Sequence, residues 1–175
     1  MTVEKDFSNT NMAHIIKPAV MTFGREVAQN TLAGTNAATT WNPMEINIWE
    51  GETWFATKGT GTLGVGGTNV SITLEAGTYE MQAQIVSYGI NGGWLKLYDQ
   101  TNSVDVARSP NIYANQTYNG SHSPMINHTW TITSSTEYRL FVYSVTAKTD
   151  YGFGVPVNRT GYTEKYLTGQ IRKLK

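Results

Sequence analysis

The residues with the greatest capacity for acid–base or metal chemistry in this sequence are three histidines. His14 lies near the N-terminus, and His122 and His128 are six positions apart with a Ser-Pro pair between them. Protein metal sites combine histidine with cysteine or acidic residues at short, recurring spacings, and these histidines have no such neighbours in the sequence. His128 falls on the apolar face of a predicted strand, which is typical of a core or interface histidine.

Two further patterns, a pair of glutamates and a glycine-rich stretch, are candidates for a hydrolase site and a phosphate-binding loop, and neither has the features that such a site requires. Glu50 and Glu52 are two positions apart, whereas the paired carboxylates of glycoside hydrolases usually come from separate elements. The glycine-rich stretch 59–67 lacks the Gly-Lys-Ser/Thr ending of a phosphate-binding loop, and a strand is predicted after it. With no cysteine and no Gly-x-Ser-x-Gly motif, the sequence predicts a chain that is not an enzyme and binds no cofactor or metal.

Composition limits the partners of the chain. Thirteen basic and thirteen acidic residues cancel, so no overall field attracts nucleic acid or an anionic membrane. The basic tail 172–175 offers too few phosphate contacts to change this expectation. No apolar run is long enough to span a membrane, and residues 1–14 lack the basic start and apolar stretch of a signal peptide. We therefore expect a chain made and kept in the cytoplasm, with neither nucleic acid nor a membrane as its partner.

Alternation with period two begins near Trp41 and continues to the end of the sequence. Charged residues make up only 15% of the chain, and the abundance of Gly, Thr, Asn, Ser and Tyr favours short strands and tight turns over surface helices. At 175 residues, one compact domain is expected. We predict an all-β fold, an antiparallel β-sandwich or jelly roll, over residues 41–175. Its expected strands lie in the segments 44–48, 69–74, 78–88, 94–98, 104–106, 126–132, 138–142 and 164–174.

Residues 1–40 have no reliable helical or strand periodicity. They hold charges at the start, one apolar patch around Pro18 and a stretch of small polar residues at 29–40. Two interpretations stay open: a frayed terminus, or an extended arm whose apolar patch adds to the surface of a neighbour. The predicted division is therefore an N-terminal arm, 1–40, and a jelly-roll domain, 41–175.

The aromatic residues indicate a binding role. Large aromatic side chains with polar tips are favoured at protein interfaces and on sugar-binding faces. In two predicted strands, Trp94 with Tyr98 and Phe141 with Tyr143 alternate with apolar residues, so both faces of these strands are apolar. Such strands are typical of a sandwich that buries its second face by oligomerising. A free carbohydrate-binding module that uses Trp94 or Trp49 as a stacking platform is an alternative.

Five segments in a fixed order resemble a phage-borne domain related to the tumour-necrosis-factor and complement globular-head jelly rolls. The resemblance covers residues 42–175 and leaves the arm unmatched. It has two departures: the arginine of the family's opening strand is missing from 44–47, and Glu75 stands where the family has proline. The matching segments are 72–79, 95–99, 131–138, 151–154 and a closing pair, 164–166 with 171–174.

This resemblance implies a tumour-necrosis-factor-like sandwich that assembles as a homotrimer in a virion and catalyses nothing. In related trimers, apolar and aromatic strand residues line the threefold axis, and the C-terminal strand lies near it. From this likeness and from the two-faced strands, the expected trimer interface contains Trp94, Tyr98, Phe141, Tyr143 and Tyr166.

Two virion roles stay open. A tail-fibre or head-fibre tip that binds a host receptor or glycan usually ends a fibrous stalk, which this sequence lacks. Forty residues before the sandwich would stretch about 130 Å at about 3.3 Å per residue, a reach that suits a clamp across capsid subunits. We therefore expect a capsid decoration (cement) protein that lies on the capsid surface and binds the major capsid protein through its arm. The expected capsid-binding residues are Ile15, Ile16, Pro18, Val20, Met21 and Phe23.

Overall fold

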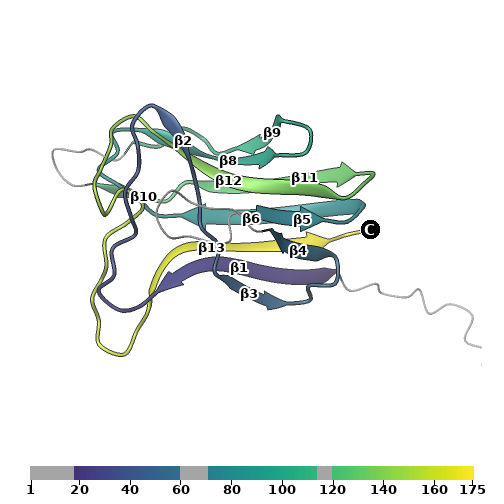
Figure 1. Cartoon of the computed structure of the whole chain (residues 1–175), viewed down its shortest axis with the longest axis horizontal. Helices are drawn as coiled ribbons and strands as arrows, with labels where there is room; N and C mark the ends of the chain where they lie inside the picture. Colours follow the sequence, from purple (N-terminus) through teal and green to yellow (C-terminus); the bar gives the residue numbers. More distant parts are fainter. Residues whose placement is uncertain (1–17, 60–70, 114–119) are drawn as a thin grey trace, which may run out of the picture.

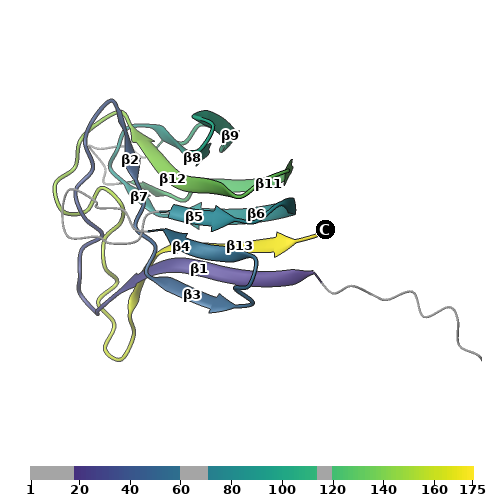
Figure 2. The same ribbon diagram turned by 45° about the vertical axis from the view of Figure 1, so that its right-hand side comes forward.

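The computed structural model describes residues 18–59, 71–113 and 120–175, and every helix or strand assigned in these ranges is a β-strand. Those ranges accordingly include no helix long and apolar enough to span a membrane. Most of the strands form two sheets that stack on each other, and two short strands pair separately, with the longer loops at one end (Figures 1 and 2). They are β1 (Ala19–Val27), β2 (Thr40–Pro43), β3 (Ile48–Gly51), β4 (Ala56–Gly59), β5 (Ser71–Leu74), β6 (Gly77–Ile85), β7 (Ser87–Tyr88), β8 (Gly93–Asp99), β9 (Val104–Arg108), β10 (Ser121–His122), β11 (Met125–Ile132), β12 (Thr136–Ser144) and β13 (Glu164–Lys173).

The sheet order identifies an antiparallel jelly roll. The first sheet has the order β11-β6-β13-β1-β3, and the second has the order β4-β5-β12-β8-β9, with β2 paired to the far half of β12. Neighbours such as β1 and β13, far apart in the sequence, are hydrogen-bonded, so the chain passes repeatedly between the two layers. The predicted fold class is confirmed.

Alternation along the strands positions the core between the sheets. On β6, Tyr79, Met81 and Ala83 are buried while Gln82 lies on the outer side of the sheet. The buried side chains of β12 alternate in the same way from the other layer. Burial of this apolar surface stabilises the sandwich by roughly 25 cal/mol for each Å² removed from water. Both strands thus have the period-two alternation expected from the sequence.

The predicted arm is wrong from residue 19 onward. β1 lies between β13 and β3, so it is an interior strand of the first sheet. Met21 and Phe23 are 0% and 3% exposed and belong to the hydrophobic core. They alternate with the exposed Thr22, but the half-buried Val20 on the outer face hides this period in the sequence. Val20, Met21 and Phe23 therefore belong to the sandwich and not to an arm.

Residues 28–40 also belong to the domain. Ala33 and Asn36 are buried, and this segment pairs with the loop that contains Lys148 and Tyr151. The described domain thus begins at the start of β1, because these backbone and core contacts order the segment. Of the expected capsid-binding residues in the described part, Pro18 alone is fully exposed. Ile15 and Ile16 lie outside the described residues.

The segment 44–48, predicted as one strand, instead crosses from one sheet to the other. The Met44 N–H donates to the Leu140 carbonyl of the second sheet at 2.9 Å, and the Asn47 N–H donates to the Gly24 carbonyl of the first sheet at 2.9 Å. Met44 and Ile46 are buried on the way. The alternation in the sequence therefore reflects passage through the core and not pairing in one sheet.

Candidate interaction surfaces

The residues considered for catalysis lie apart from one another. His122 is exposed on β10, His128 is half-buried on β11, and Glu50 and Glu52 are exposed on and just after β3. In the described ranges, no three His, Asp or Glu side chains come together in a way that could hold a metal ion. The structure thus assembles no catalytic group from these four residues. Outside the described residues lie His14 and positions 60–67 of the glycine-rich stretch.

Five aromatic side chains form one cluster on the outer side of the second sheet. Because β2, β12 and β8 are neighbours, Tyr143 stands between Trp41 and Trp94, with ring-centroid distances of 5.4 and 5.1 Å. Tyr98 and Phe141 continue the cluster at 5.8 Å. All five side chains are half-buried. We call these five residues the aromatic face.

Lys96 lies in the middle of the aromatic face. The residue is only 8% exposed, and its ammonium group is 4.2 Å from the ring centroid of Trp41 and 4.7 Å from that of Tyr98. The same group forms an ion pair with Asp105 at 2.7 Å. Each cation–π contact contributes about 0.5–2 kcal/mol, depending on its burial. The aromatic face therefore holds a buried cation that is paired within the chain.

The two tryptophans considered as sugar-stacking platforms each form a cation–π contact with a basic side chain of the protein. The guanidinium of Arg108 lies 5.6 Å from the Trp94 ring centroid, and the ammonium of Lys58 lies 5.6 Å from that of Trp49. Both indoles are half-buried. A sugar that stacks on the covered face of either ring would have to displace its cation.

The structure brings together four of the five residues expected at the trimer interface, and Tyr166 is the exception. It belongs to β13 in the opposite sheet and is 3% exposed. Its hydroxyl donates to the Thr31 carbonyl at 2.7 Å. Burial raises the pKa of Tyr166 to about 12, with Glu164 adding to the rise and Arg25 opposing it. Tyr166 is thus enclosed by the chain's own loops, and the five residues do not form one surface.

The outer side of the first sheet has an uncharged centre. Thr22, Gln82, Gln84, Thr168 and Gln170 line a shallow depression of about 250 Å³, and we call these five residues the amide face. The Gln170 side-chain N–H₂ donates to the Gln82 side-chain carbonyl at 3.1 Å. Toward either end of β13, cations of that strand pair with anions of its neighbours. These ion pairs are Arg172–Glu80 and Lys165–Glu26.

The sandwich is open along one side, between β11 and β9. These strands end the two sheets, so each has a neighbour on one side only. Val104 is 50% exposed, and Val106, Trp130 and Ile132 are half-buried beside it. His128 stacks on the Trp130 indole with ring centroids 6.1 Å apart. We call this apolar row the open edge.

The described chain begins and ends at the same end of the sandwich, away from the long loops (Figure 1). The exposed Pro18 precedes β1 there, and Leu174, which follows β13, is 38% exposed. Trp54 is 68% exposed, and the Lys173 ammonium lies 4.8 Å from its ring centroid. We call Pro18, Trp54, Lys173, Leu174 and Lys175 the docking end.

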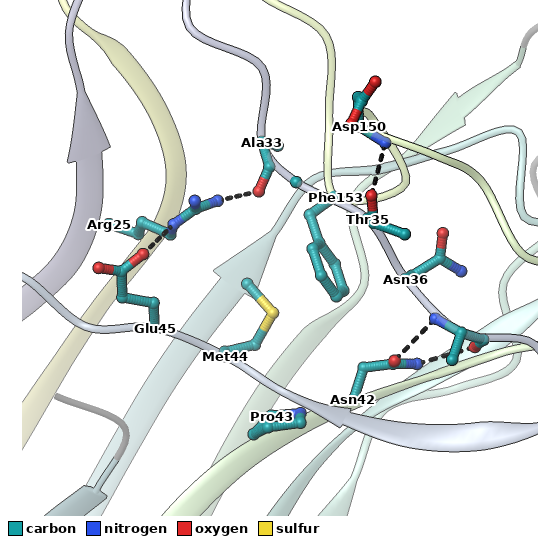
Figure 3. A pocket seen from close by; sticks show the side chains of 12 residues that line it. Arg25, Ala33, Thr35, Asn36, Asn42, Pro43, Met44, Glu45, Asp150 and Phe153 are labelled. Carbon is teal, nitrogen blue, oxygen red and sulfur yellow. Dashed lines mark hydrogen bonds and ion pairs between the residues drawn. The ribbon is translucent and has the colours of Figure 1, made fainter. Parts of the chain in front are cut away.

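At the loop end, a cavity of about 460 Å³ lies between the segment 33–37 and the loop that contains Phe153 (Figure 3). Arg25 pairs with Glu45 at 2.9 Å and also donates to the Ala33 carbonyl. The Asn36 amide donates to the Thr146 carbonyl and accepts from a backbone N–H of the same loop. These polar groups hold the loops to each other. The amide and guanidinium groups that line the cavity are therefore already bonded to the loops around it, and they serve to hold the fold together.

Comparison with known proteins establishes the fold. No family model matches the sequence, and no curated protein sequence matches it. Among solved structures, Eiger TNF from S. frugiperda is similar with a TM-score of 0.50 at 13% identity, covering 90% of this chain and 93% of that one. The globular domain of zebrafish complement 1qA protein has a TM-score of 0.48 at 12% identity, covering 89% and 94%. The PRD1 vertex protein P5 has a TM-score of 0.49 at 10% identity, covering 90% and 97%. The chain thus has a tumour-necrosis-factor-like jelly roll, as the resemblance implied.

Proposed function

We propose that this jelly roll is a homotrimeric structural protein of a bacteriophage virion, and that it decorates the capsid. It binds the major capsid protein through the docking end and the residues that precede Pro18, and it catalyses nothing. The ordered sequence segments that resemble a phage-borne domain support the virion role.

The observation that carries the proposal is the position of Pro18. Because this residue stands at the docking end, the described chain begins at the same end as the exposed Trp54 and Leu174. Lys173 and Lys175 add positive charge at the same end. A partly apolar, acidic patch of capsid protein is the complementary surface. The long loops at the opposite end then face outward.

The trimer contact joins the open edge of one copy to the amide face of the next. Interface cores are depleted of charged residues, which fits the amide face better than the aromatic face with its buried Lys96. Since edge and face are different surfaces, the contact is heterologous and closes into a ring after three copies if each is rotated by a third of a turn. The open edge, with the half-exposed Val104 and the half-buried Trp130, is the apolar surface that this contact buries.

Removal of residues 2–17 tests capsid attachment. The truncation ends before β1, so the core is intact, and the expected result is a trimer that no longer co-sediments with purified capsids. Trp54→Ala should weaken co-sedimentation at least tenfold, while the matched change of an exposed aromatic at the loop end, Tyr162→Ala, should not. Undiminished capsid binding by the truncated chain would contradict the proposal.

Charge placed on each face tests the trimer contact. Gln82→Arg puts one unpaired cation into each of the three proposed contacts and should give monomers in sedimentation velocity. Phe141→Glu on the aromatic face should leave the trimer intact. If Phe141→Glu dissociates the trimer and Gln82→Arg does not, the interface is the aromatic face expected from Trp94, Tyr98, Phe141 and Tyr143.

A fibre tip that binds a host receptor is the second candidate. It is favoured by the exposed side chains Val157 and Tyr162 at the end opposite Pro18, where a receptor would be met. This role predicts binding of the full-length trimer to host cells and no binding to capsids.

A further inference from the structure

Exposed apolar side chains gather on two neighbouring loops at the loop end. Leu32 is 41% exposed, Val155 39%, Val157 82% and Tyr162 62%. The two loops are joined by a hydrogen bond from the Gln29 side chain to the Asn158 side chain. An exposed group of apolar side chains on a folded protein often marks a binding site.

Glu164 fixes the shape of the loop 155–163. Its carboxylate is buried and accepts backbone N–H groups of Val157 at 3.0 Å, Asn158 at 2.9 Å and Asn30 at 3.3 Å. The bond from Val157, with those from Asn158 and Asn30, holds the pKa of Glu164 below its usual value. The loop is therefore preorganised, and a ligand that binds it loses little free energy to ordering.

A cavity of about 630 Å³ lies between this loop and the start of β13. Ligand sites in proteins are typically about 300–1,000 Å³, so the space suits a molecule of one or two sugar rings. Ser121 and Thr163 line its wall, where the Thr163 hydroxyl donates to the Glu26 carboxylate, and Tyr162 also lines the cavity. An exposed aromatic ring beside hydroxyl groups fits the apolar C–H face and the hydroxyls of a saccharide.

The charges around the cavity favour an anion. Arg159 makes no salt bridge within the described ranges, and its guanidinium lies 5.0 Å from the Tyr162 ring centroid. Lys165 has a partner in Glu26, and both carboxylate oxygens of Glu164 accept backbone N–H groups. The lining therefore has a guanidinium available for a carboxylate or phosphate, which are its preferred partners.

We propose that this cavity binds a saccharide that carries a carboxylate or a phosphate. The sugar ring packs against Tyr162, and its anionic group pairs with Arg159. Its hydroxyls bond to Ser121 and donate to the Thr163 hydroxyl, whose own proton is given to Glu26. The inference goes beyond capsid attachment and holds for either virion role. Sugar binding and capsid binding use opposite ends of the chain, so the two proposals fail independently.

Saturation-transfer NMR with the full chain and three matched sugars tests the proposal. Glucuronate and glucose 6-phosphate carry the two anionic groups, and glucose is the neutral control with the same ring. The expected result is saturable binding of at least one anionic sugar, at least tenfold tighter than that of glucose. Preference between the two anionic sugars identifies carboxylate or phosphate as the recognised group. Equal binding of all three sugars, or binding of none, would overturn the proposal.

Variants then locate the site. Tyr162→Ala and Arg159→Gln should each weaken binding of the preferred sugar at least tenfold while leaving the thermal midpoint of unfolding unchanged, because both side chains are on the surface. Trp54→Ala and Lys175→Gln are the matched controls at the docking end and should bind as the unmodified chain does. An equal loss in Arg159→Gln and Lys175→Gln would show unspecific charge attraction and overturn the proposal.

Discussion

Phe23 on β1 lies directly opposite Gly169 on β13, and its ring fills the space in which a side chain at position 169 would stand. The ring is 3% exposed and packs in the core of the first sheet. Because Gly169 has no side chain, β13 leaves room for the Phe23 ring of β1. This pairing makes residues 19–27 part of the folding unit.

Gly169→Ala is therefore expected to destabilise the protein by about 1–3 kcal/mol, because the added methyl group forces the Phe23 ring from its place. Urea denaturation measures the change. In the Phe23→Ala background the same substitution should cost much less, since the ring has gone. Thr57→Ala, at an exposed position of β4, is the control, with an expected change within about 0.5 kcal/mol. Additive effects of Gly169→Ala and Phe23→Ala would contradict the steric account.

Two truncations locate the boundary between arm and domain. Removal of residues 2–17 should leave the thermal midpoint of unfolding unchanged, whereas removal of 2–25 takes away most of β1 and should prevent folding. Circular dichroism melting distinguishes them. Phe23→Ala alone should cost about 3–5 kcal/mol, the usual range for a buried phenylalanine. A folded, stable protein without residues 2–25 would show that β1 is dispensable.

Glu164 gives a defined dependence of stability on pH. Its pKa is lowered from the ordinary 4.5 in the folded state, so folding favours the ionised carboxylate. The resulting stabilisation is present above the unfolded-state pKa and is lost as the pH falls through the folded-state pKa. Glu164→Gln should therefore lower the free energy of unfolding at pH 7 and by less at pH 3. A difference that does not shrink on acidification would argue against the carboxylate as the cause; Glu137→Gln, in a half-exposed ion pair, is the control.

Lys96 should stabilise the monomer through the aromatic face. Lys96→Met keeps the length of the side chain but loses the ion pair and the contacts with Trp41 and Tyr98, and we expect a cost of about 1–2 kcal/mol. Asp105→Asn removes the ion pair only and should cost less than about 1 kcal/mol, since Asp105 is half-exposed. Neither change should alter the trimer. Dissociation of the trimer by Lys96→Met would instead assign the aromatic face to the interface.

The sequence predicts well those strands in which apolar residues recur at every second position. Along β6 and β12 these positions are buried and the positions between them are half-buried or exposed, so both strands could be predicted. β1 could not, because Val20 on its outer face breaks the alternation and Pro18 precedes it. The clustering of Trp41 with Tyr143 depends on the pairing of β2 with β12, which no local pattern reveals. Lys96 did carry a signal, a lysine alternating with aromatics, but its burial follows only from its neighbours.

Other parts of the surfaces had no sequence signal. Glu164 bonds to backbone N–H groups, which any residue type supplies, so its partners leave no trace in the sequence. Tyr166 lies at the register shift between β13 and β1, and its side chain joins the core beneath segments from distant parts of the chain. It therefore does not share a surface with the other four residues predicted at the trimer interface. The amide face was not predicted because glutamines and threonines are ordinary on an exposed strand.

Cryo-electron microscopy of the virus particle that carries this protein tests the central claim most directly. The account predicts density on the capsid shell for groups of three sandwiches, each with Trp54 and Pro18 toward the shell and Tyr162 outward. Density for the sandwich only at a tail fibre, or on the shell with the loop end inward, would contradict it.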